Sequence, residues 1–303
     1  MSERPVIKPP GNPTSDDEAI VQTNVVKLSS ERPGSATGPD WVASEAPLEV
    51  RIGGVPVTVL MRTPGSDEEL VRGFLYGEGV VTSAADFLSV GPVHPSPEDV
   101  GGSVINVQMS PERKGRMLDR AFYSNASCGV CGKKTIESLE VKGAIAKSHL
   151  EVSRSVLGGL PDRLRNEQTT FAKTGGVHAS GLFTPQGALV VLREDVGRHN
   201  ALDKIIGWAL AEGKLPLSDY VLLVSGRVSY EIVQKAVVAG IPLIAAVGAP
   251  SSLAVDLAER FHLTLIGFLK PDSMNVYTHA ERVLLARSMT AHLTIPTREI
   301  GRS

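Results

Sequence analysis

Three short apolar runs in the C-terminal half of the chain constrain its fold more than any other feature. They cover residues 220–224, 242–247 and 263–268, and helical patterns at 230–239 and 252–261 separate them. Parallel strands need a crossover connection, which is usually a helix, so this alternation predicts a parallel sheet. The runs are apolar throughout rather than alternating, which predicts helices on both faces of that sheet.

The residues around these runs complete an α/β domain that we predict at 135–303. Thr278 and Glu281 have the spacing of a capping box, which opens a helix. A Pro-Gln-Gly turn joins two β-rich runs into a hairpin. The additional predicted elements are the hairpin at 181–183 and 188–192 and helices at 200–211 and 278–288.

A smaller α/β subdomain is predicted at 41–124. Its β-rich runs are 48–52, 55–61 and 104–109. The first two join at Gly53-Gly54, a two-residue turn that is typical of a hairpin. Ser66 and Glu69 form a second capping-box pattern, which predicts a helix to about Tyr76.

Residues 1–40 are expected to be a largely disordered tail. They contain six of the 20 prolines and few large apolar side chains. Such a segment cannot bury enough apolar surface to offset the entropy lost on ordering. Residues 20–28 are the exception, because their β-rich composition could add an edge strand.

Composition excludes several classes of protein. The formal charge is −2, so the surface has no basic field for indiscriminate nucleic-acid binding. No run of about 20 apolar residues could cross a membrane, and the N-terminus lacks a hydrophobic signal core. Only two cysteines occur, which excludes a secreted disulfide scaffold and favours a reducing, cytoplasmic compartment.

Small or polar residues follow each of the three apolar runs. They are 225–227, 248–251 and 270–273. Ligands of open α/β sheets bind outside the carboxyl ends of the strands, where helix N-termini suit phosphate. These loops therefore favour a nucleotide or another phosphate-bearing ligand. The alternative is that Gly and Ser simply form tight turns, and no dinucleotide or P-loop fingerprint is present.

The two cysteines, Cys128 and Cys131, form a CxxC pattern that admits four interpretations. A structural zinc site would need two more ligands, such as His178 and His199. A thioredoxin-like redox pair would normally begin a helix after a strand. Both thiols could also fill a pocket without reacting. The fourth interpretation is a nucleophilic arm that carries sulfur or an acyl group between two molecules.

The residues around the cysteines favour the arm. Gly129 and Gly132 make the segment 125–134 conformationally permissive, so we predict a mobile loop. Lys133 and Lys134 supply positive charge that could lower the pKa of a nearby thiol.

Two polar clusters are further candidates for binding or catalytic support. They are residues 174–178, which end in His178, and residues 194–200, which include Arg198 and His199. The second cluster contains more ionisable groups than a turn requires. The plain alternative is that Asp195 or Asn200 caps the following helix while Arg198 is a solvated charge.

These polar segments resemble those of the FdhD family, the formate dehydrogenase accessory sulfurtransferases. The resemblance runs from about residue 42 to residue 285. Its motifs are Ser127-Cys128-Gly-Val-Cys131-Gly, Thr174-Gly-Gly-Val-His178-Ala, Glu194-Asp-Val-Gly-Arg-His199-Asn-Ala-Leu-Asp203-Lys204, Ser225-Gly-Arg227-Val-Ser-Tyr-Glu231 and Gly267-Phe268-Leu-Lys270-Pro271.

The resemblance implies a sulfur carrier. Such proteins take sulfur from a cysteine desulfurase and transfer it to the molybdenum of a bis(molybdopterin guanine dinucleotide) cofactor, which is then inserted into formate dehydrogenase. Cys128 matches the cysteine that carries the persulfide, and Cys131 matches the second cysteine. The family fold is a cytidine-deaminase-like α/β domain with a mixed sheet and helices plus a smaller N-terminal part, and its members form homodimers.

The resemblance also assigns residues to the guanine-dinucleotide cargo. The contact segment of the family maps onto Phe268, Leu269, Lys270, Pro271, Asp272 and Ser273. The last of these positions is usually basic in the family, so Lys270 would have to supply a charged contact that Ser273 cannot. His178, Arg198, His199 and Arg227 are further candidates for cargo binding, and no resident metal is expected.

Three other functions remain open at this stage. A cofactor-binding chaperone would hold the cargo without sulfur chemistry. A CxxC thiol-disulfide oxidoreductase would use the same two cysteines, and so would a zinc protein.

Overall fold

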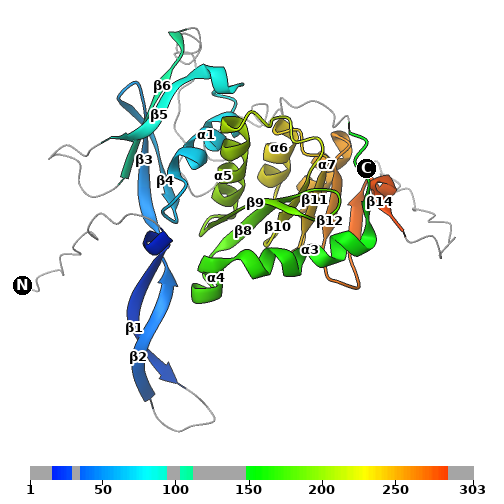
Figure 1. The fold of residues 1–303 in the computed structure, drawn as a ribbon, viewed down its shortest axis with the longest axis horizontal. Helices are drawn as coiled ribbons and strands as arrows, with labels where there is room; N and C mark the ends of the chain where they lie inside the picture. The colour runs from blue at the N-terminus through cyan, green and yellow to red at the C-terminus, as the bar shows by residue number, and fades with distance from the viewer. Residues whose placement is uncertain (1–15, 29–34, 94–102, 112–147, 286–303) are drawn as a thin grey trace, which may run out of the picture.

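A computed structural model describes residues 16–28, 35–93, 103–111 and 148–285. They form a C-terminal domain around a six-stranded sheet, a smaller N-terminal unit around a four-stranded sheet, and a projecting two-stranded ribbon (Figure 1). The predicted fold class is confirmed: a C-terminal α/β domain with a mixed sheet and helices, and a smaller N-terminal α/β subdomain. The predicted domain boundary and the predicted loop 125–134 lie outside the described residues.

The six-stranded sheet contains the three apolar runs as neighbouring parallel strands, as predicted. Its strand order is β13-β12-β11-β10-β8-β9, and β8 and β13 run antiparallel to their neighbours β10 and β12. The predicted hairpin is β8 paired with β9. The strands are β8 (His178–Phe183), β9 (Leu189–Asp195), β10 (Val221–Val224), β11 (Leu243–Ala246), β12 (Thr264–Gly267) and β13 (Asn275–Thr278).

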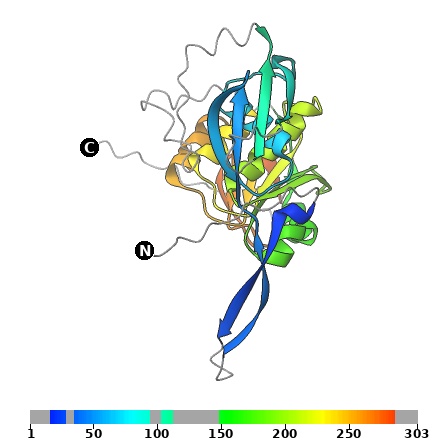
Figure 2. The ribbon, with the colours of Figure 1, turned by 90° about the vertical axis from the view of Figure 1, so that its left-hand side faces the viewer.

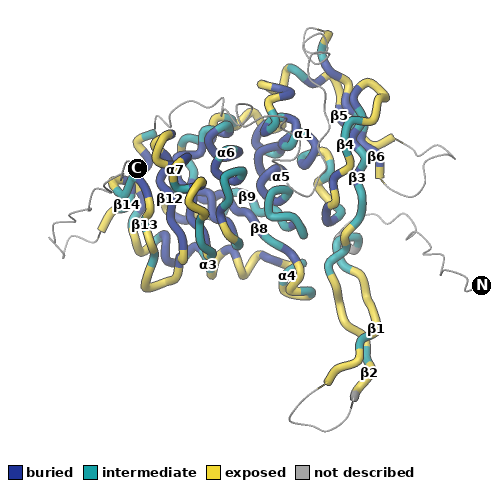
Figure 3. Tube along the Cα trace, turned by 180° about the vertical axis from the view of Figure 1, so that it is seen from behind, coloured by how far each residue is buried: buried dark blue, intermediate teal, exposed yellow. Residues whose placement is uncertain are grey.

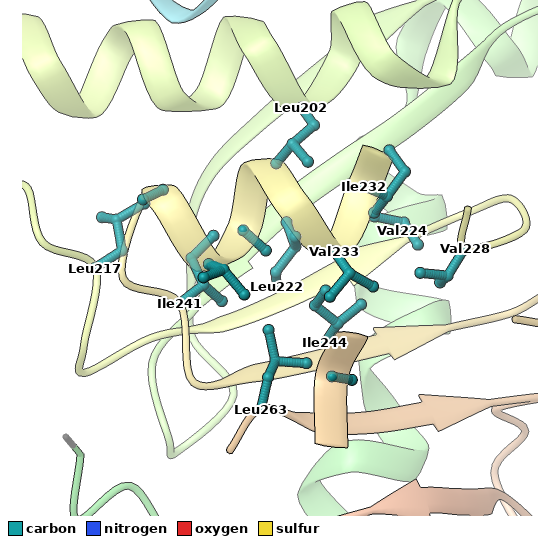
Figure 4. Packing of buried hydrophobic residues seen from close by; sticks show 14 of the residues in the cluster. Leu202, Leu217, Leu222, Val224, Val228, Ile232, Val233, Ile241, Ile244 and Leu263 are labelled. Carbon is teal, nitrogen blue, oxygen red and sulfur yellow. The ribbon is translucent and has the colours of Figure 1, made fainter. Parts of the chain in front are cut away.

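Helices cover both faces of this sheet, which explains why its central strands are apolar throughout. One face packs on α5 (Arg198–Ala211), α6 (Tyr230–Val238) and α7 (Ser252–Arg260), and Figure 4 shows Leu222 and Ile244 among the residues of this core. The opposite face packs on α3 (Arg154–Glu167), which is followed by α4 (Thr169–Thr174). Among the helices of the described residues, none has the length and apolarity needed to span a bilayer.

The N-terminal unit is a four-stranded sheet covered by one helix, α1 (Asp67–Gly77). The predicted hairpin is confirmed, since Gly53 and Gly54 adopt φ values of 59° and 85° in the turn between β3 and β4. The strand order is β4-β3-β6-β5, with β3 and β6 parallel. The elements are β3 (Ala46–Ile52), β4 (Val55–Arg62), η2 (Ala84–Asp86), β5 (Phe87–Val93) and β6 (Ser103–Met109).

The predicted capping box at the start of α1 is wrong, although the helix itself is confirmed. Ser66 has a left-handed backbone (φ 55°) and makes no side-chain cap bond. The extended backbone that a capping serine needs is therefore absent. Glu69 instead forms an ion pair with Arg193 of β9, at 2.6 Å.

The described part of the N-terminal segment, residues 16–28 and 35–40, is more ordered than predicted, and the strand suggested at residues 20–28 is present. After η1 (Asp16–Ala19), β1 (Ile20–Leu28) pairs antiparallel with β2 (Ser35–Ala43) along its whole length. Residues 35–40 lie in this ribbon, so the prediction that folded structure begins near residue 41 is wrong. The ribbon projects from the rest of the molecule (Figure 2) and is largely exposed (Figure 3). Backbone pairing with β1 overrides the weak β-propensity of the Gly38-Pro39-Asp40 sequence in β2.

The predicted helix at 278–288 is wrong over the described residues. Thr278 does not cap a helix, because its hydroxyl bonds to the backbone of Leu263 and Leu265 in the neighbouring strand. His279 then adopts a left-handed backbone (φ 48°). The chain continues as η4 (Ala280–Arg282) and β14 (Val283–Leu284), which pairs with β7 (Val152–Ser153).

The two units join where α1 crosses α5 at a pair of glycines. A Cβ atom on Gly207 would lie 1.8 Å from the carbonyl oxygen of Glu69, and one on Gly73 would lie 1.8 Å from that of Asp203. Carbon and oxygen atoms in van der Waals contact stay well beyond 3 Å apart. Only glycine at both positions therefore allows the two helix backbones to touch.

Gly207→Ala should reduce the free energy of unfolding by about 3 kcal/mol or more, because the methyl group can be accommodated only by separating the helices. Gly159→Ala in α3 is the matched control, since the nearest atom to its Cβ position is Arg163 Nε at 4.0 Å. This control should be neutral or stabilising by up to about 1 kcal/mol. Urea denaturation followed by circular dichroism measures both, and similar midpoints for the two variants would contradict the glycine crossing.

Candidate functional site

Hydrogen bonds join the loops after β10, β11 and β12 into one continuous surface at the carboxyl ends of these strands, which we call the strand edge. Gly248 donates its N–H to the carbonyl oxygen of Gly226 at 3.1 Å, and Phe268 donates to that of Gly248 at 3.1 Å. A Cβ on Gly248 would lie 2.8 Å from the carbonyl oxygen of Gly226, so this close approach requires glycine. The carboxyl edge expected from the sequence therefore exists and is built from backbone.

His178 lies at the same edge because β8 runs antiparallel to β10. Its Nδ1 is 3.1 Å from the Cβ position of Gly226. Ser225 fixes the start of β8, since its hydroxyl accepts from the N–H of Ala179 at 2.9 Å. The structure thus brings together the Thr174–His178 and Ser225–Arg227 motifs.

The predicted cargo-binding segment follows β12 and rests on α3. Arg154 donates to the carbonyl oxygen of Asp272, and the backbone of Pro271 lies against Gly158. Leu269 is 1% exposed and belongs to the core beneath the sheet, so its side chain cannot contact a ligand. The exposed members of the segment are Phe268, Lys270, Pro271, Asp272 and Ser273.

Phe268 is the most distinctive of these residues. The residue is 44% exposed, and its backbone has φ 52°, a left-handed conformation that is uncommon for a bulky residue. Its N–H is fixed on Gly248 and the following residue is anchored in the core. The surrounding structure therefore maintains local strain at this point, as is typical of functional sites.

The second polar cluster divides into a buried half and an edge-facing half. Asp195 is fully buried, where it pairs with Lys204 at 2.8 Å and accepts from the N–H of Thr63 at 3.2 Å. It also accepts from Gly197 and from the side chain of Asn200. The suggestion that Asp195 or Asn200 caps α5 is wrong, because the N-cap of α5 is Gly197 and no side chain caps the helix. Asp195 and Asn200 instead have structural roles.

Arg198 and His199 occupy the first turn of α5, next to the buried half. The Nε atom of Arg198 is buried and has no hydrogen-bond partner in the described part of the chain. An arginine of this kind is not simply a solvated charge. Arg227, on the loop after β10, is exposed.

His199 connects the first turns of α5 and α6. Its Nε2 lies 2.9 Å from a carboxylate oxygen of Glu231 and 3.1 Å from the hydroxyl of Ser229. The hydrogen bond from His199 is the largest cause that holds the pKa of Glu231 below the ordinary value; burial opposes it, and the charge of His199 lowers the pKa further by a smaller amount. Glu231 ends one of the motifs found in the sequence, but it was given no role in the site, because no local spacing connects positions 199 and 231.

His178 has a different electrostatic environment. Burial lowers the pKa of its imidazole, and the positive charges of Arg198 and His199 lower it further, against a smaller opposing effect of Asp195. The neutral form of His178 is therefore favoured. The edge combines a neutral histidine with a histidine that is paired to a carboxylate.

The predicted catalytic cysteines, Cys128 and Cys131, lie outside the described residues. Within the residues that the structure does describe, no group of three His, Cys, Asp or Glu side chains is arranged to hold a metal ion. His178 and His199 are present at the edge, with the partners described above.

Comparison with known proteins identifies close relatives. A profile described as "FdhD/NarQ family" matches residues 43–284. Proteins named "Sulfur carrier protein FdhD" from Mycobacterium tuberculosis and Streptomyces coelicolor are 50% and 49% identical over 256 and 259 residues, which cover 82% of this chain and 93% and 91% of theirs. The Sulfurisphaera tokodaii protein of the same name is 45% identical over 88% of this chain and 99% of its own.

A solved structure shares the fold. It comes from Desulfotalea psychrophila, and its name assigns it as a formate dehydrogenase accessory protein. It superposes with a TM-score of 0.69 at 26% identity and covers 88% of this chain and 100% of its own. The similarity thus extends across both units.

Asp195→Ala should reduce the free energy of unfolding by about 3–5 kcal/mol, because it leaves the buried Lys204 ammonium without its anion. Arg198→Ala, three residues away, should change it by less than about 1 kcal/mol, because no described partner is lost. Chemical denaturation of both variants measures the difference. Equal losses would contradict the division of this cluster into structural and edge-facing residues.

His178→Gln should change how stability depends on pH. The folded state disfavours protonated His178, so the unfolded state binds the proton first as the pH falls below about 6.5. The free energy of unfolding of the wild type therefore decreases as the pH falls from about 7 to about 5, and that of the variant should decrease less. Denaturation midpoints across that range test this, and parallel profiles would contradict it.

Proposed function

Because this chain belongs to the FdhD/NarQ family, we propose that it is a sulfur carrier required for formate dehydrogenase activity. The observation that carries the proposal is the 45–50% identity to proteins named sulfur carriers, over nearly their whole length. The only two cysteines of the chain lie within the matched residues 43–284, in the CxxC pattern that the sequence associates with a nucleophilic arm.

In the first step, Cys128 accepts sulfur from the persulfide of a cysteine desulfurase. Its thiolate attacks the terminal sulfur of the donor persulfide, a new S–S bond forms on Cys128, and the donor cysteine leaves as a thiolate. No oxidant is required, because the transferred sulfur keeps its oxidation state. Lys133 and Lys134 favour the attacking thiolate through their positive charge.

The cargo that receives this sulfur is the molybdenum bis(molybdopterin guanine dinucleotide) cofactor. The exposed ring of Phe268 offers a stacking surface for a guanine base, and Lys270 offers a charge for phosphate. Arg198, Arg227 and the N-terminus of α5 supply further donors for anionic groups at the same edge. His178 and His199 complete the proposed cargo site.

In the second step, Cys131 releases the sulfur. Its thiolate attacks the inner sulfur of the Cys128 persulfide, which leaves a Cys128–Cys131 disulfide and liberates the outer sulfur as sulfide for the metal. The two cysteines are oxidised while the sulfur is reduced, so a thiol reductant must restore them. This chemistry suits a reducing cytoplasm. We further propose that the protein acts as a homodimer and delivers the cargo to formate dehydrogenase.

Incubation with a cysteine desulfurase and cysteine should add the mass of one sulfur atom to the protein, as measured by intact mass spectrometry. Cys128→Ala should remove this adduct, because the attacking thiolate is lost. Cys131→Ala is the matched control and should still accept sulfur, while losing the ability to release it as sulfide. An adduct of unchanged abundance on Cys128→Ala would contradict the assignment.

The same variants discriminate between sulfur transfer and a cofactor chaperone without sulfur chemistry. A Cys128→Ala, Cys131→Ala double variant should fail to support formate dehydrogenase activity in cells that lack the wild-type protein. Full activity with the double variant would instead favour the chaperone.

A further inference from the structure

Tyr277 is the extra residue of a β-bulge in β13. Leu265 of β12 pairs with Thr278. The following residue, Ile266, pairs with Val276, so Tyr277 lies between two paired residues and has no paired residue of its own. Bulges bend the strand, change the direction of the side chain they carry, and are common beside functional sites. The bulge therefore marks Tyr277 as a residue whose direction is not set by the regular pleat of β13.

The ring of Tyr277 reaches the strand edge at Gly267, directly before Phe268. Its Cε2 atom is 3.1 Å from the Cβ position of Gly267, and Pro250 Cδ is 2.8 Å from the same position. The carbonyl oxygen of Gly248, which accepts from the N–H of Phe268, is 3.2 Å from it. A side chain at position 267 would push these groups apart, so glycine is required for the tyrosine to lie against the loops.

Tyr277 is available to a ligand at this position. The residue is 38% exposed, and the neighbouring Phe268 is 44% exposed. Across residues 16–28, 35–93, 103–111 and 148–285, no hydrogen bond joins the Tyr277 hydroxyl to another group and no aromatic ring packs on its ring. The end of the strand edge at β12 and β13 thus presents two exposed aromatic residues, of which one has a free hydroxyl.

Exposed basic residues lie on the same strand edge. Lys270 follows Phe268 by two residues, and Arg227 lies on the loop after β10. Neighbouring strands are about 4.8 Å apart, so β10 lies about 10 Å from β12 along the sheet. A ligand that carries a flat ring system and an anionic group in one molecule can therefore contact both kinds of residue.

We propose that Tyr277 is a binding residue for the purine base of the cargo and that it recognises the base together with Phe268. The inference rests on the proposed function, which supplies a guanine dinucleotide as the ligand. Aromatic rings suit a base because both have flat π faces that stack. The hydroxyl of Tyr277 can also bond to a polar group on the edge of the base.

An apolar segment of a partner protein is the alternative occupant. It would cover the two aromatic residues, but it would make no use of the positive charges of Lys270 and Arg227. A nucleotide satisfies both, because its phosphate groups are anionic and accept hydrogen bonds from lysine and arginine. The observations therefore favour the base over an apolar peptide.

Binding of guanosine diphosphate, measured by isothermal titration calorimetry, tests the role of Tyr277. Tyr277→Ala should weaken binding about tenfold, which is typical for the loss of one ring that stacks on a base. Tyr277→Phe keeps the ring and should retain most of the affinity. Trp41→Ala is the matched control, because Trp41 is also 44% exposed but lies on the projecting ribbon, and it should bind like the wild type. Unchanged affinity in Tyr277→Ala would overturn the inference, and so would an equal loss in Tyr277→Phe.

Chemical nitration of the wild type tests the same contact without a substitution. Guanosine diphosphate should protect Tyr277 from tetranitromethane, as measured by peptide mass spectrometry. Tyr220 is the internal control, because it precedes β10 at the opposite end of the strand, and its nitration should not change. Equal nitration of Tyr277 with and without the nucleotide overturns the inference and leaves the proposed function intact. A wild-type protein that binds no guanosine diphosphate overturns the proposed cargo, and this inference with it.

Discussion

The direct backbone contact between α1 and α5 at Gly73 and Gly207 is the constraint on which the rest of the structure depends. Several polar contacts surround it and fix a single docking arrangement of the two units. They are the ion pair Glu69–Arg193 and the bonds from Lys204 and Asn200 to the backbone of Thr63 and Met61. Another packing of α1 on α5 would separate Glu69 from Arg193 and would remove the bond from the buried Lys204 ammonium to Thr63, which is costly because a buried charge needs its polar partners.

This junction explains why one short segment contains so many ionisable residues. The segment 194–204 faces two neighbours at once. Asp195 and Lys204 point into the contact with the N-terminal unit, and Arg198 and His199 lie at the strand edge. The N-terminal unit therefore supports the candidate site indirectly, because Thr63 bonds to Asp195 and Lys204. None of its described side chains lies at the strand edge itself. Residues that the sequence groups into one functional cluster are thus partly scaffold and partly site.

Local sequence patterns correctly predicted the strands and turns that depend on neighbouring residues. They were wrong where contacts between residues distant in sequence determine the local structure. Continuous apolarity sufficed for β10, β11 and β12, and Gly53-Gly54 sufficed for the first hairpin. The strand β2 could not be predicted, because its weakly β-forming residues are ordered by β1. Ser66 and Thr278 have the spacing of helix caps, yet the backbone of one is left-handed and the hydroxyl of the other bonds across the sheet. The pairing of His199 with Glu231 arises only when α5 and α6 pack side by side.

The loops of the strand edge hold their conformation without a ligand, because hydrogen bonds between backbone groups fix them. Gly226, Gly248 and Phe268 are connected by peptide hydrogen bonds, so the exposed side chains around them do not have to hold the loops in place. A left-handed backbone at a non-glycine residue costs roughly 1–2 kcal/mol. Burial of Leu269 and the bond from Phe268 to Gly248 oppose that cost and keep the aromatic ring exposed. If the guanine base of the proposed cargo stacks on this ring, it meets a surface whose ordering entropy was already lost during folding, and this would favour tight binding from few contacts.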